Sequence, residues 1–168
     1  MGTKEEEVEI GVRHVPPDEG RSLWVLGELV TYKTTSEQTG GAYSLFEVTT
    51  RPRTGPPPHV HHREDESFYV LDGAYEFLVE GRTIRASAGC LFYFPKGTLH
   101  SHKNVGEGVG RMLLTHTPGG LYERFFAEVG NPVGEEGGRL AFDDQPEVGR
   151  IREVAAKYGI EIPPPMTQ

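Results

Sequence analysis

Short hydrophobic runs rich in β-branched and aromatic residues recur along the chain from about residue 22 to residue 117. Turn-forming segments such as Gly81-Arg82 and Pro95-Lys96-Gly97 separate the runs, and hydrophobic residues at helical spacing are not found among them. Many short strands at intervals of about 8–12 residues, with turn signals between them, are typical of a β-sandwich or β-barrel. The runs expected to form strands are 23–26, 28–32, 43–50, 67–71, 75–79, 91–94 and 111–117.

Hydrophobic residues at helical spacing occur only after residue 117. The first such stripe consists of Leu121, Phe125, Phe126 and Val129. Gly130 predicts the end of this helix, and we interpret the stripe as packing against the barrel rather than as a lid. A second helix is predicted to begin near Asp144, with Pro146 in its first turn, and to end at Gly159.

These patterns divide the chain into three segments. We expect an N-terminal arm over residues 1–21, a β-barrel over 22–117 and a helical extension over 118–168. A length of 168 residues suits one domain with a hydrophobic core. The predicted fold class is therefore all-β, with a short C-terminal helical extension.

Composition and charge narrow the classes of partner and compartment. The net charge of −8 and the isoelectric point near 5.4 argue against a nucleic-acid or anionic-membrane partner, because such binders need a basic face. The single cysteine, Cys90, allows no internal disulfide and suits a reducing compartment. The acidic N-terminus does not look like a signal peptide, and no apolar run approaches the roughly 18 residues of a membrane span. We therefore expect a cytoplasmic protein that acts on a small molecule.

Five of the seven histidines fall into two clusters, at 59–62 and 100–102. Because side chains two residues apart on a strand share a face, His59 and His61 are expected to point the same way. We interpret 62–65 as the turn of a hairpin that returns Glu66 opposite this pair, and His100 as the start of a third strand. Three imidazoles and one carboxylate suit one divalent transition metal ion, namely Mn, Fe, Ni, Cu or Zn, whereas Ca and Mg prefer oxygen ligands.

In these residues the sequence resembles the cupin superfamily, which has two ordered motifs. The second motif, G-x5-P-x-G-x2-H-x3-N, fits at Gly89, Pro95, Gly97, His100 and Asn104. The first, G-x5-H-x-H-x3or4-E-x6-G, fits at His59, His61, Glu66 and Gly73. Gly55 departs from the first motif, with three residues between it and His59 rather than five, and we expect it to shape a loop.

The resemblance spans roughly residues 55–104 and implies a cupin jelly-roll-like β-barrel with a metal ion inside it. The metal ligands it implies are His59, His61, Glu66 and His100. Asp65 lies next to Glu66, but only Glu66 keeps six residues before Gly73. The resemblance also implies a homodimer with edge strands pairing across the interface, for which N-terminal strands such as 24–32 are candidates.

Two residues are candidates for proton transfer, Glu66 and His102. His102 follows His100 by two residues, so it should share that strand face and point into the barrel. It is either a core histidine bonded to a backbone carbonyl or a general acid or base near the metal. By contrast, His62 is interpreted as a turn or outer residue, Arg63 and Glu64 as solvated turn charges, and His116 receives no role.

The stretch 56–66 also resembles the quercetin 2,3-dioxygenase-like branch of single-domain cupins. This resemblance implies a metal-dependent dioxygenase that acts on a small organic substrate, with phenols as one class. Two other functions stay open. One is a metal-dependent isomerase or lyase without redox chemistry, and the other is a module that binds a small ligand without chemistry, because one fold can host all three.

Overall fold

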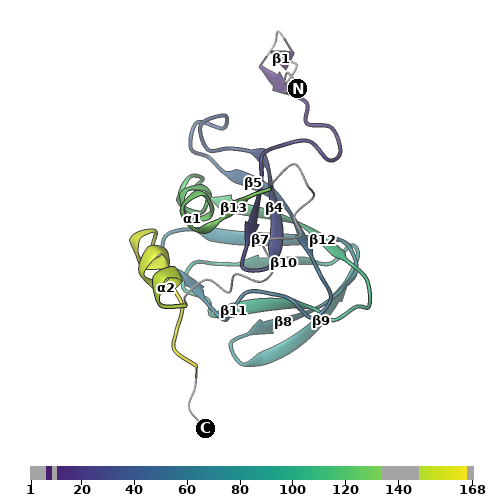
Figure 1. Ribbon diagram of the computed structural model, residues 1–168, viewed down its shortest axis with the longest axis vertical. Helices are drawn as coiled ribbons and strands as arrows, with labels where there is room; N and C mark the ends of the chain where they lie inside the picture. Colours follow the sequence, from purple (N-terminus) through teal and green to yellow (C-terminus); the bar gives the residue numbers. More distant parts are fainter. Residues whose placement is uncertain (1–6, 9–10, 134–147, 166–168) are drawn as a thin grey trace.

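A computed structural model gives the fold, and it describes residues 7–8, 11–133 and 148–165. Most elements in this part of the chain are β-strands, and two short helices lie on one flank of them (Figure 1). The expected all-β barrel with a C-terminal helical extension is therefore confirmed. The division of the chain at residues 22 and 118 stays a prediction.

Two antiparallel sheets form the walls of the barrel. The large sheet contains β3 (Ser22–Val25), β4 (Glu28–Thr34), β5 (Ser44–Thr50), β7 (Asp65–Asp72), β10 (Leu91–Phe94), β12 (Gly110–Thr117) and β13 (Asn131–Pro132). Its strand order is β10-β7-β12-β5-β4-β3-β13. The small sheet has the order β11-β8-β9 and contains β8 (Ala74–Val79), β9 (Arg82–Ser87) and β11 (His100–Asn104).

The strands alternate between buried and more exposed residues, as expected for a sheet with one face on a core. Ser44, Phe46, Val48 and Thr50 are the buried residues of β5, and Gly110, Met112, Leu114 and His116 are those of β12. Two-residue turns with positive φ at both positions connect β3 to β4 and β8 to β9; in the second, Glu80 and Gly81 have φ of 47° and 80°. Such turns match the natural twist of a hairpin. Local sequence therefore determines these two hairpins.

Aromatic rings fill one half of the barrel interior. Phe77 of β8 stacks on Phe92 of β10 with ring centroids 4.0 Å apart, and Phe68 of β7 lies 5.5 Å from Phe77. Fully burying one such side chain contributes roughly 1.5–3 kcal/mol. These contacts cross from one sheet to the other and hold the two walls together.

The helical extension packs against the barrel. Helix α1 (Leu121–Val129) buries Tyr122, Phe125 and Phe126. The ring of Phe126 contacts Phe46 at 5.2 Å, so α1 packs on the barrel as expected. Helix α2 (Val148–Lys157) lies beside α1, and the predicted start near Asp144 falls outside the described residues.

The expected hairpin around residues 62–65 is wrong. The ligand strand β6 (Val60–His61) pairs with β14 (Ile160–Glu161) from the C-terminal end of the chain, not with β7. His59 forms an isolated antiparallel bridge with His100, which attaches this segment to the small sheet. The backbone N–H of His62 also donates to the carbonyl of Gly159 at 2.9 Å. The C-terminal segment thus completes the wall that carries the first histidine pair.

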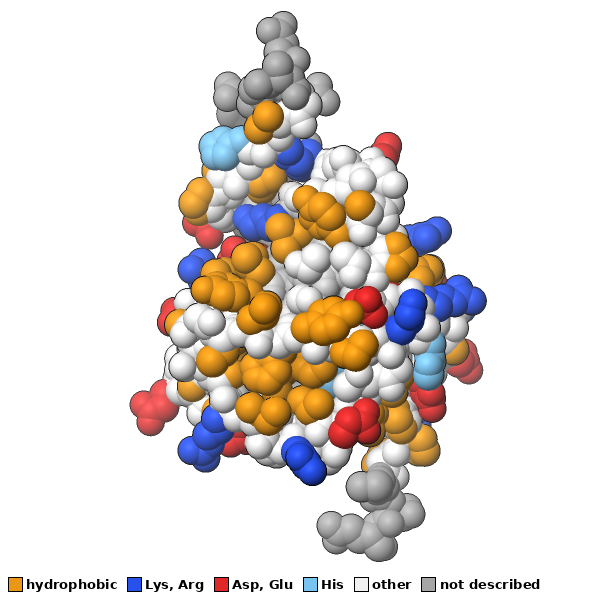
Figure 2. Space-filling view, turned by 180° about the vertical axis from the view of Figure 1, so that it is seen from behind, with side chains coloured by type: hydrophobic (Ala, Val, Ile, Leu, Met, Phe, Trp, Pro, Cys, Tyr) orange, Lys and Arg blue, Asp and Glu red, His pale blue; other side chains and the backbone are white. Residues whose placement is uncertain are grey.

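The strands expected to meet a second copy are not free edges. β4 lies between β5 and β3, and β13 pairs with Leu23 and Trp24 of β3. The other edge of the large sheet is β10, where Leu91 and Tyr93 are 66% and 59% exposed. Figure 2 shows hydrophobic side chains gathered over the middle of one face of the molecule. The homodimer stays a prediction, but its expected location within 24–32 is not supported by the sheet order.

Two small features complete the described structure. At the N-terminal end, β1 (Glu7–Val8) pairs with β2 (Val12–Arg13) outside the barrel (Figure 1). Neither of the two helices in the described part of the chain is long and apolar enough to cross a membrane.

Candidate metal centre

The four predicted metal ligands meet inside the barrel, between its two walls. Glu66 projects from β7 of the large sheet, whereas His100 projects from β11 of the small sheet. His59 and His61 come from the segment that pairs with β11 and β14. All four side chains are buried, with exposures of 4% or less. We call His59, His61, Glu66 and His100 the ligand cluster.

The ligand cluster has the size of a metal site. Each member offers one nitrogen or carboxylate oxygen, and these atoms all lie within 4.8 Å of one another. His59 Nε2 and His61 Nε2 are buried and have no hydrogen-bond partner among the described residues. Buried polar atoms without a partner are unusual because each costs about 1–3 kcal/mol. A metal ion would use both nitrogens, so the residues fit the predicted ion.

Hydrogen bonds on the far side of each imidazole fix its orientation. The Nδ1 atoms of His59 and His100 donate to the carbonyl oxygens of Pro57 at 2.9 Å and Thr98 at 3.0 Å. His61 Nδ1 donates to Glu64 Oε1 at 3.1 Å. Because carbonyl and carboxylate oxygens only accept, Nδ1 carries the proton in each ring and Nε2 faces the centre. This is the arrangement that metal-ligating histidines usually have.

Protonation differs between the histidines of the cluster. Burial, with His61 and His100 nearby, lowers the pKa of His59 well below its usual value. Burial also acts to lower the pKa of His100, but its hydrogen bond to Glu66 and the charge of that carboxylate outweigh burial and raise the pKa. His100 Nε2 donates to Glu66 Oε2, so His100 holds two protons in this arrangement. A metal ion would have to displace the proton on His100 Nε2.

Glu66 is ionised although it is buried. Burial by itself raises the pKa of this carboxyl, but the neighbouring His61 and His116 and the hydrogen bonds from His100 and His116 lower it well below its usual value. An ionised carboxylate is the form that ligates a metal ion. The electrostatics of the site therefore agree with the donor set.

Two residues that sequence analysis passed over lie against the cluster. Glu64, expected as a solvated turn charge, is 1% exposed and holds His61. His116 is fully buried on β12, and its Nε2 donates to Glu66 Oε1 at 2.9 Å. The alternation of β12 could have found His116, because it follows the buried Met112 and Leu114 at a spacing of two. By contrast, His62 is exposed, as expected, and binds Glu161 at 2.7 Å.

Aromatic side chains enclose the cluster. Phe94 stacks on His100 with ring centroids 4.3 Å apart, and Tyr122 of α1 meets the ring of His61 at 4.8 Å. Tyr122 also lies 4.1 Å from His116. Burial and the nearby carboxylates of Glu66, Glu28 and Glu64 raise the pKa of Tyr122 well above its usual value. The predicted stripe contained Leu121 in place of Tyr122, whereas the helix buries Tyr122 with Phe125 and Phe126.

His102 points into the barrel, as expected, but it does not join the ligand cluster. Its Nε2 lies 2.7 Å from Glu28 Oε1, and its ring contacts Phe68 at 5.1 Å. Glu28 belongs to the large sheet and His102 to the small one, so this buried pair links the two walls. The partner of His102 is thus a carboxylate rather than the backbone carbonyl considered from the sequence.

The displaced glycine of the first motif has a packing role. A Cβ atom at Gly55 would lie 1.9 Å from the carbonyl oxygen of His102, which is far inside van der Waals contact. The backbone at Gly55 therefore runs directly against β11, and only glycine allows this approach. The expectation that Gly55 shapes a loop agrees with this contact.

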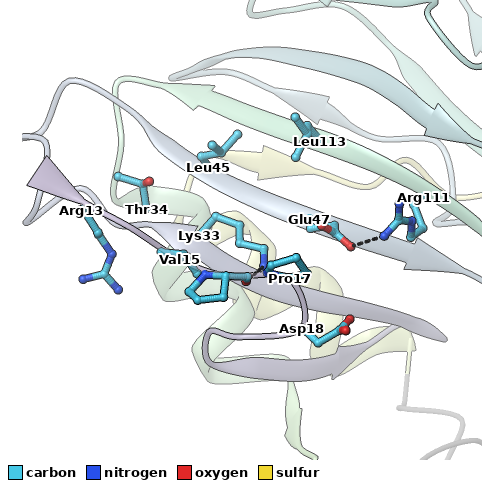
Figure 3. A pocket seen from close by; sticks show the side chains of 11 residues that line it. Arg13, Val15, Pro17, Asp18, Lys33, Thr34, Leu45, Glu47, Arg111 and Leu113 are labelled. Atoms are coloured by element: carbon cyan, nitrogen blue, oxygen red, sulfur yellow. Dashed lines mark hydrogen bonds and ion pairs between the residues drawn. The ribbon is translucent and has the colours of Figure 1, made fainter. Parts of the chain in front are cut away.

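Figure 3 shows a surface pocket of about 440 Å³ whose lining contains no member of the ligand cluster. Its lining includes Lys33, Leu45, Glu47, Arg111 and Leu113. On β5 and β12 these positions alternate with the buried ones, so the pocket lies on the outer face of the large sheet. The ion pair between Glu47 and Arg111, 3.5 Å long, borders it. The pocket therefore does not open onto the predicted metal centre.

Comparison with known proteins shows which protein families the barrel is similar to. The family model described as "Cupin domain" matches residues 46–116. Germin-like protein 1-1 of Oryza sativa subsp. japonica is 34% identical over 75 residues, which cover 42% of this chain and 35% of that protein. Germin-like protein subfamily 2 member 2 of Arabidopsis thaliana is 35% identical over 75 residues, which cover 42% of this chain and 34% of that protein. The chain thus spans about a third of the length of these relatives.

Solved structures share the fold at low identity. A predicted oxalate decarboxylase from Thermotoga maritima has a TM-score of 0.58 and 19% identity, and the match covers 62% of this chain and 98% of that chain. The polyketide cyclase RemF from Streptomyces resistomycificus has a TM-score of 0.57 and 19% identity, over 63% of this chain and 79% of that chain. The predicted jelly-roll-like barrel is confirmed, while the narrower resemblance to one dioxygenase branch stays a prediction.

Proposed function

From the cupin fold of the barrel and the match of residues 46–116 to the cupin domain, we propose that the chain is a metal-dependent dioxygenase. Its substrate would be a small organic molecule, with phenols as one class. The observation that carries the proposal is the convergence of three imidazoles and one ionised carboxylate within 4.8 Å in a buried site. Nitrogen-rich mixed donor sets favour first-row transition metals. All four members of the ligand cluster would hold the ion.

The ion, when bound, supplies Lewis acidity and, as Mn, Fe or Cu, redox chemistry with O2. The remaining work falls to the chain. The pKa of Glu66 is lowered well below its usual value, so its carboxylate could accept a proton from a substrate hydroxyl. The rings of Phe94 and Tyr122 cover His100 and His61, and they exclude water from reactive species formed there.

The dioxygenase proposal is tested with the protein loaded separately with Fe, Mn, Ni and Cu. We expect bleaching of a flavonol, or turnover within a panel of phenols and diketones, with matching uptake of O2. The His59→Ala, His100→Ala double variant is the control, and it should show neither effect. No O2 uptake with any metal and any member of the panel would contradict the proposal.

A second candidate, an isomerase or lyase without redox chemistry, is favoured by one observation. Glu28 and His102 form a buried carboxylate–histidine pair inside the barrel, which is a common arrangement for a general base. Turnover under strict exclusion of O2 would favour this candidate over the dioxygenase. In either case we expect His102→Ala to keep the metal and lose activity, and loss of the metal in that variant would make His102 a structural or ligand residue instead.

The third reading, a module that binds a small ligand without chemistry, is separated by the same panel. A ligand-dependent rise in thermal stability without any turnover would support it. The intact set of four ligand positions argues for metal chemistry, because binding alone does not require them. The small-molecule substrate, the homodimer and the cytoplasmic location all remain part of the proposal.

A further inference from the structure

The two oxygens of Glu66 have different neighbours. Oε2 accepts a hydrogen bond from His100 Nε2, a member of the ligand cluster. Oε1 accepts one from His116 Nε2 at 2.9 Å and lies 3.6 Å from His61 Nε2. His116 is not a member of the ligand cluster, although it forms a second set of possible metal ligands with His61 and Glu64. Both oxygens therefore lie near an imidazole of the cluster, but only Oε1 also accepts a hydrogen bond from a histidine outside it.

The sheet itself sets this pairing. In the ladder between β12 and β7, His116 lies directly opposite Glu66, and the side chains of such a pair stand on the same face. On its other side, β12 places His116 opposite Ser44 of β5. The rings of Tyr122 and Phe46 pack against the imidazole at 4.1 and 6.1 Å. His116 is fully buried, so its ring has little freedom to leave Glu66.

We propose that His116 is a positioning residue that makes Glu66 bind the metal ion through Oε2 alone. This inference rests on the metal binding proposed above. A carboxylate that chelates an ion must offer both oxygens to it, and the His116 N–H occupies Oε1 with a hydrogen bond. Because a chelating carboxylate occupies two coordination positions, His116 keeps one position available for substrate. This role deepens the proposed enzymatic function and does not depend on which reaction follows.

The role predicts which substitutions preserve the centre. His116→Gln places an amide N–H near the position of Nε2 and should still hold Oε1. His116→Phe fills the ring space between Tyr122 and Phe46 but offers no donor to Glu66. His116→Asn offers an amide on a side chain that is too short to reach Oε1 in the same way. The three variants separate the donor from the volume of the ring.

The experiment uses Co(II), because the intensity of its visible absorption reports its coordination number. Each protein is titrated with Co(II) after circular dichroism has established that it is folded. We expect His116→Gln to reproduce the wild-type spectrum at equal stoichiometry. His116→Phe and His116→Asn should still bind Co(II) but lose visible intensity, as Glu66 turns to offer both oxygens. If only one of these two variants folds, that variant alone is compared with His116→Gln and the wild type.

The outcomes distinguish this inference from the proposed function. A wild-type protein that does not bind Co(II) would overturn the metal centre itself. A wild-type protein that binds Co(II), with spectra unchanged in the folded Phe and Asn variants, would overturn only the role of His116. Loss of intensity in the Gln variant as well would show that ring packing, not the N–H donor, is what matters, and would also overturn it.

Discussion

Among the described residues, the ligand cluster and the pair of Glu28 and His102 both bury carboxylates against histidines, but the pair does not resemble a metal site. In the ligand cluster, three imidazoles surround Glu66, and two of their nitrogens lack a partner among the described residues. In the second arrangement, Glu28 and His102 bind each other through a single contact of 2.7 Å. Both are buried, so burial does not separate them.

The number of converging donors does separate them. Anchors on the outer nitrogens hold His59, His61 and His100 so that their Nε2 atoms meet. The Nε2 atom of His102 instead forms a hydrogen bond with Glu28, and its ring lies in the aromatic half of the barrel, near Phe68. The ligand cluster thus contains converging nitrogens that have no hydrogen-bond partner among the described residues, which a metal ion could use. The nitrogen of His102 already has a partner, and this pair joins the two walls of the barrel. Three perturbations test this distinction.

The largest effect on folding is expected from Glu28→Ala. The change leaves His102 buried without its partner, which should lower the free energy of unfolding by about 2–3 kcal/mol. Because Glu28 lies outside the ligand cluster, the metal affinity should stay within about twofold of wild type, which is less than about 0.5 kcal/mol of binding free energy. Urea unfolding and competition with a chelator measure the two quantities. Glu107→Gln, at an exposed position, controls for the loss of a carboxylate. Loss of the metal in Glu28→Ala would contradict the distinction, because it would mean that Glu28 and His102 belong to the metal site.

The next effect is on metal affinity and concerns Glu64. Glu64→Gln keeps an acceptor for His61 Nδ1 but removes the charge that makes this imidazole a stronger ligand. Metal affinity should fall about 10–100-fold, as is typical when such an outer carboxylate is changed. Competition with a chelator of known affinity measures the change. An affinity equal to that of wild type would mean that Glu64 is only a buried structural acid.

The smallest effect is the pH dependence of metal binding. The pKa of His100 is raised and that of His59 is lowered, so of these two His100 keeps, to higher pH, a proton that the ion must displace. Lower pH therefore weakens binding, by up to about tenfold per pH unit while His100 is protonated. His59 adds nothing over this range because it is already neutral.

Calorimetry in buffers of different ionisation enthalpy counts the protons released. We expect proton release that is greatest below the pKa of His100 and decreases as the pH rises above it. The Glu28→Ala variant should release the same number, because its substitution lies outside the ligand cluster. Release of no proton at about pH 6 would contradict the raised pKa of His100.

Much of this arrangement could be predicted from local sequence. The spacing of His59, His61, Glu66 and His100 gave the members that meet in the structure, and the stripe after residue 120 gave α1. Both features depend on residues close together in the chain or on a motif with fixed spacing. The hairpin predicted at 62–65 failed because β6 pairs with β14, a hundred residues away, and no local pattern reports such a pairing.

The supporting residues were harder to predict for a related reason. Glu28 and His102 meet across the two sheets, and His116 meets Glu66 across neighbouring strands, so their roles depend on register. Glu64 looked like a turn charge because it stands among Arg63, Asp65 and other polar residues. Only the fold shows that its carboxylate accepts a hydrogen bond from His61 Nδ1. Residues that orient a site are thus less visible in sequence than the ligands they orient.

The central claim, that the ligand cluster holds one divalent transition metal ion, is tested most directly by elemental analysis. Wild-type protein, the His59→Ala, His100→Ala double variant and Glu28→Gln should be purified without chelators or a nickel column. We predict close to one ion of Mn, Fe, Ni, Cu or Zn per chain in the wild type and in Glu28→Gln, and none in the double variant. A wild-type protein that lacks metal and refuses added metals, or a double variant that retains its ion, would contradict the claim.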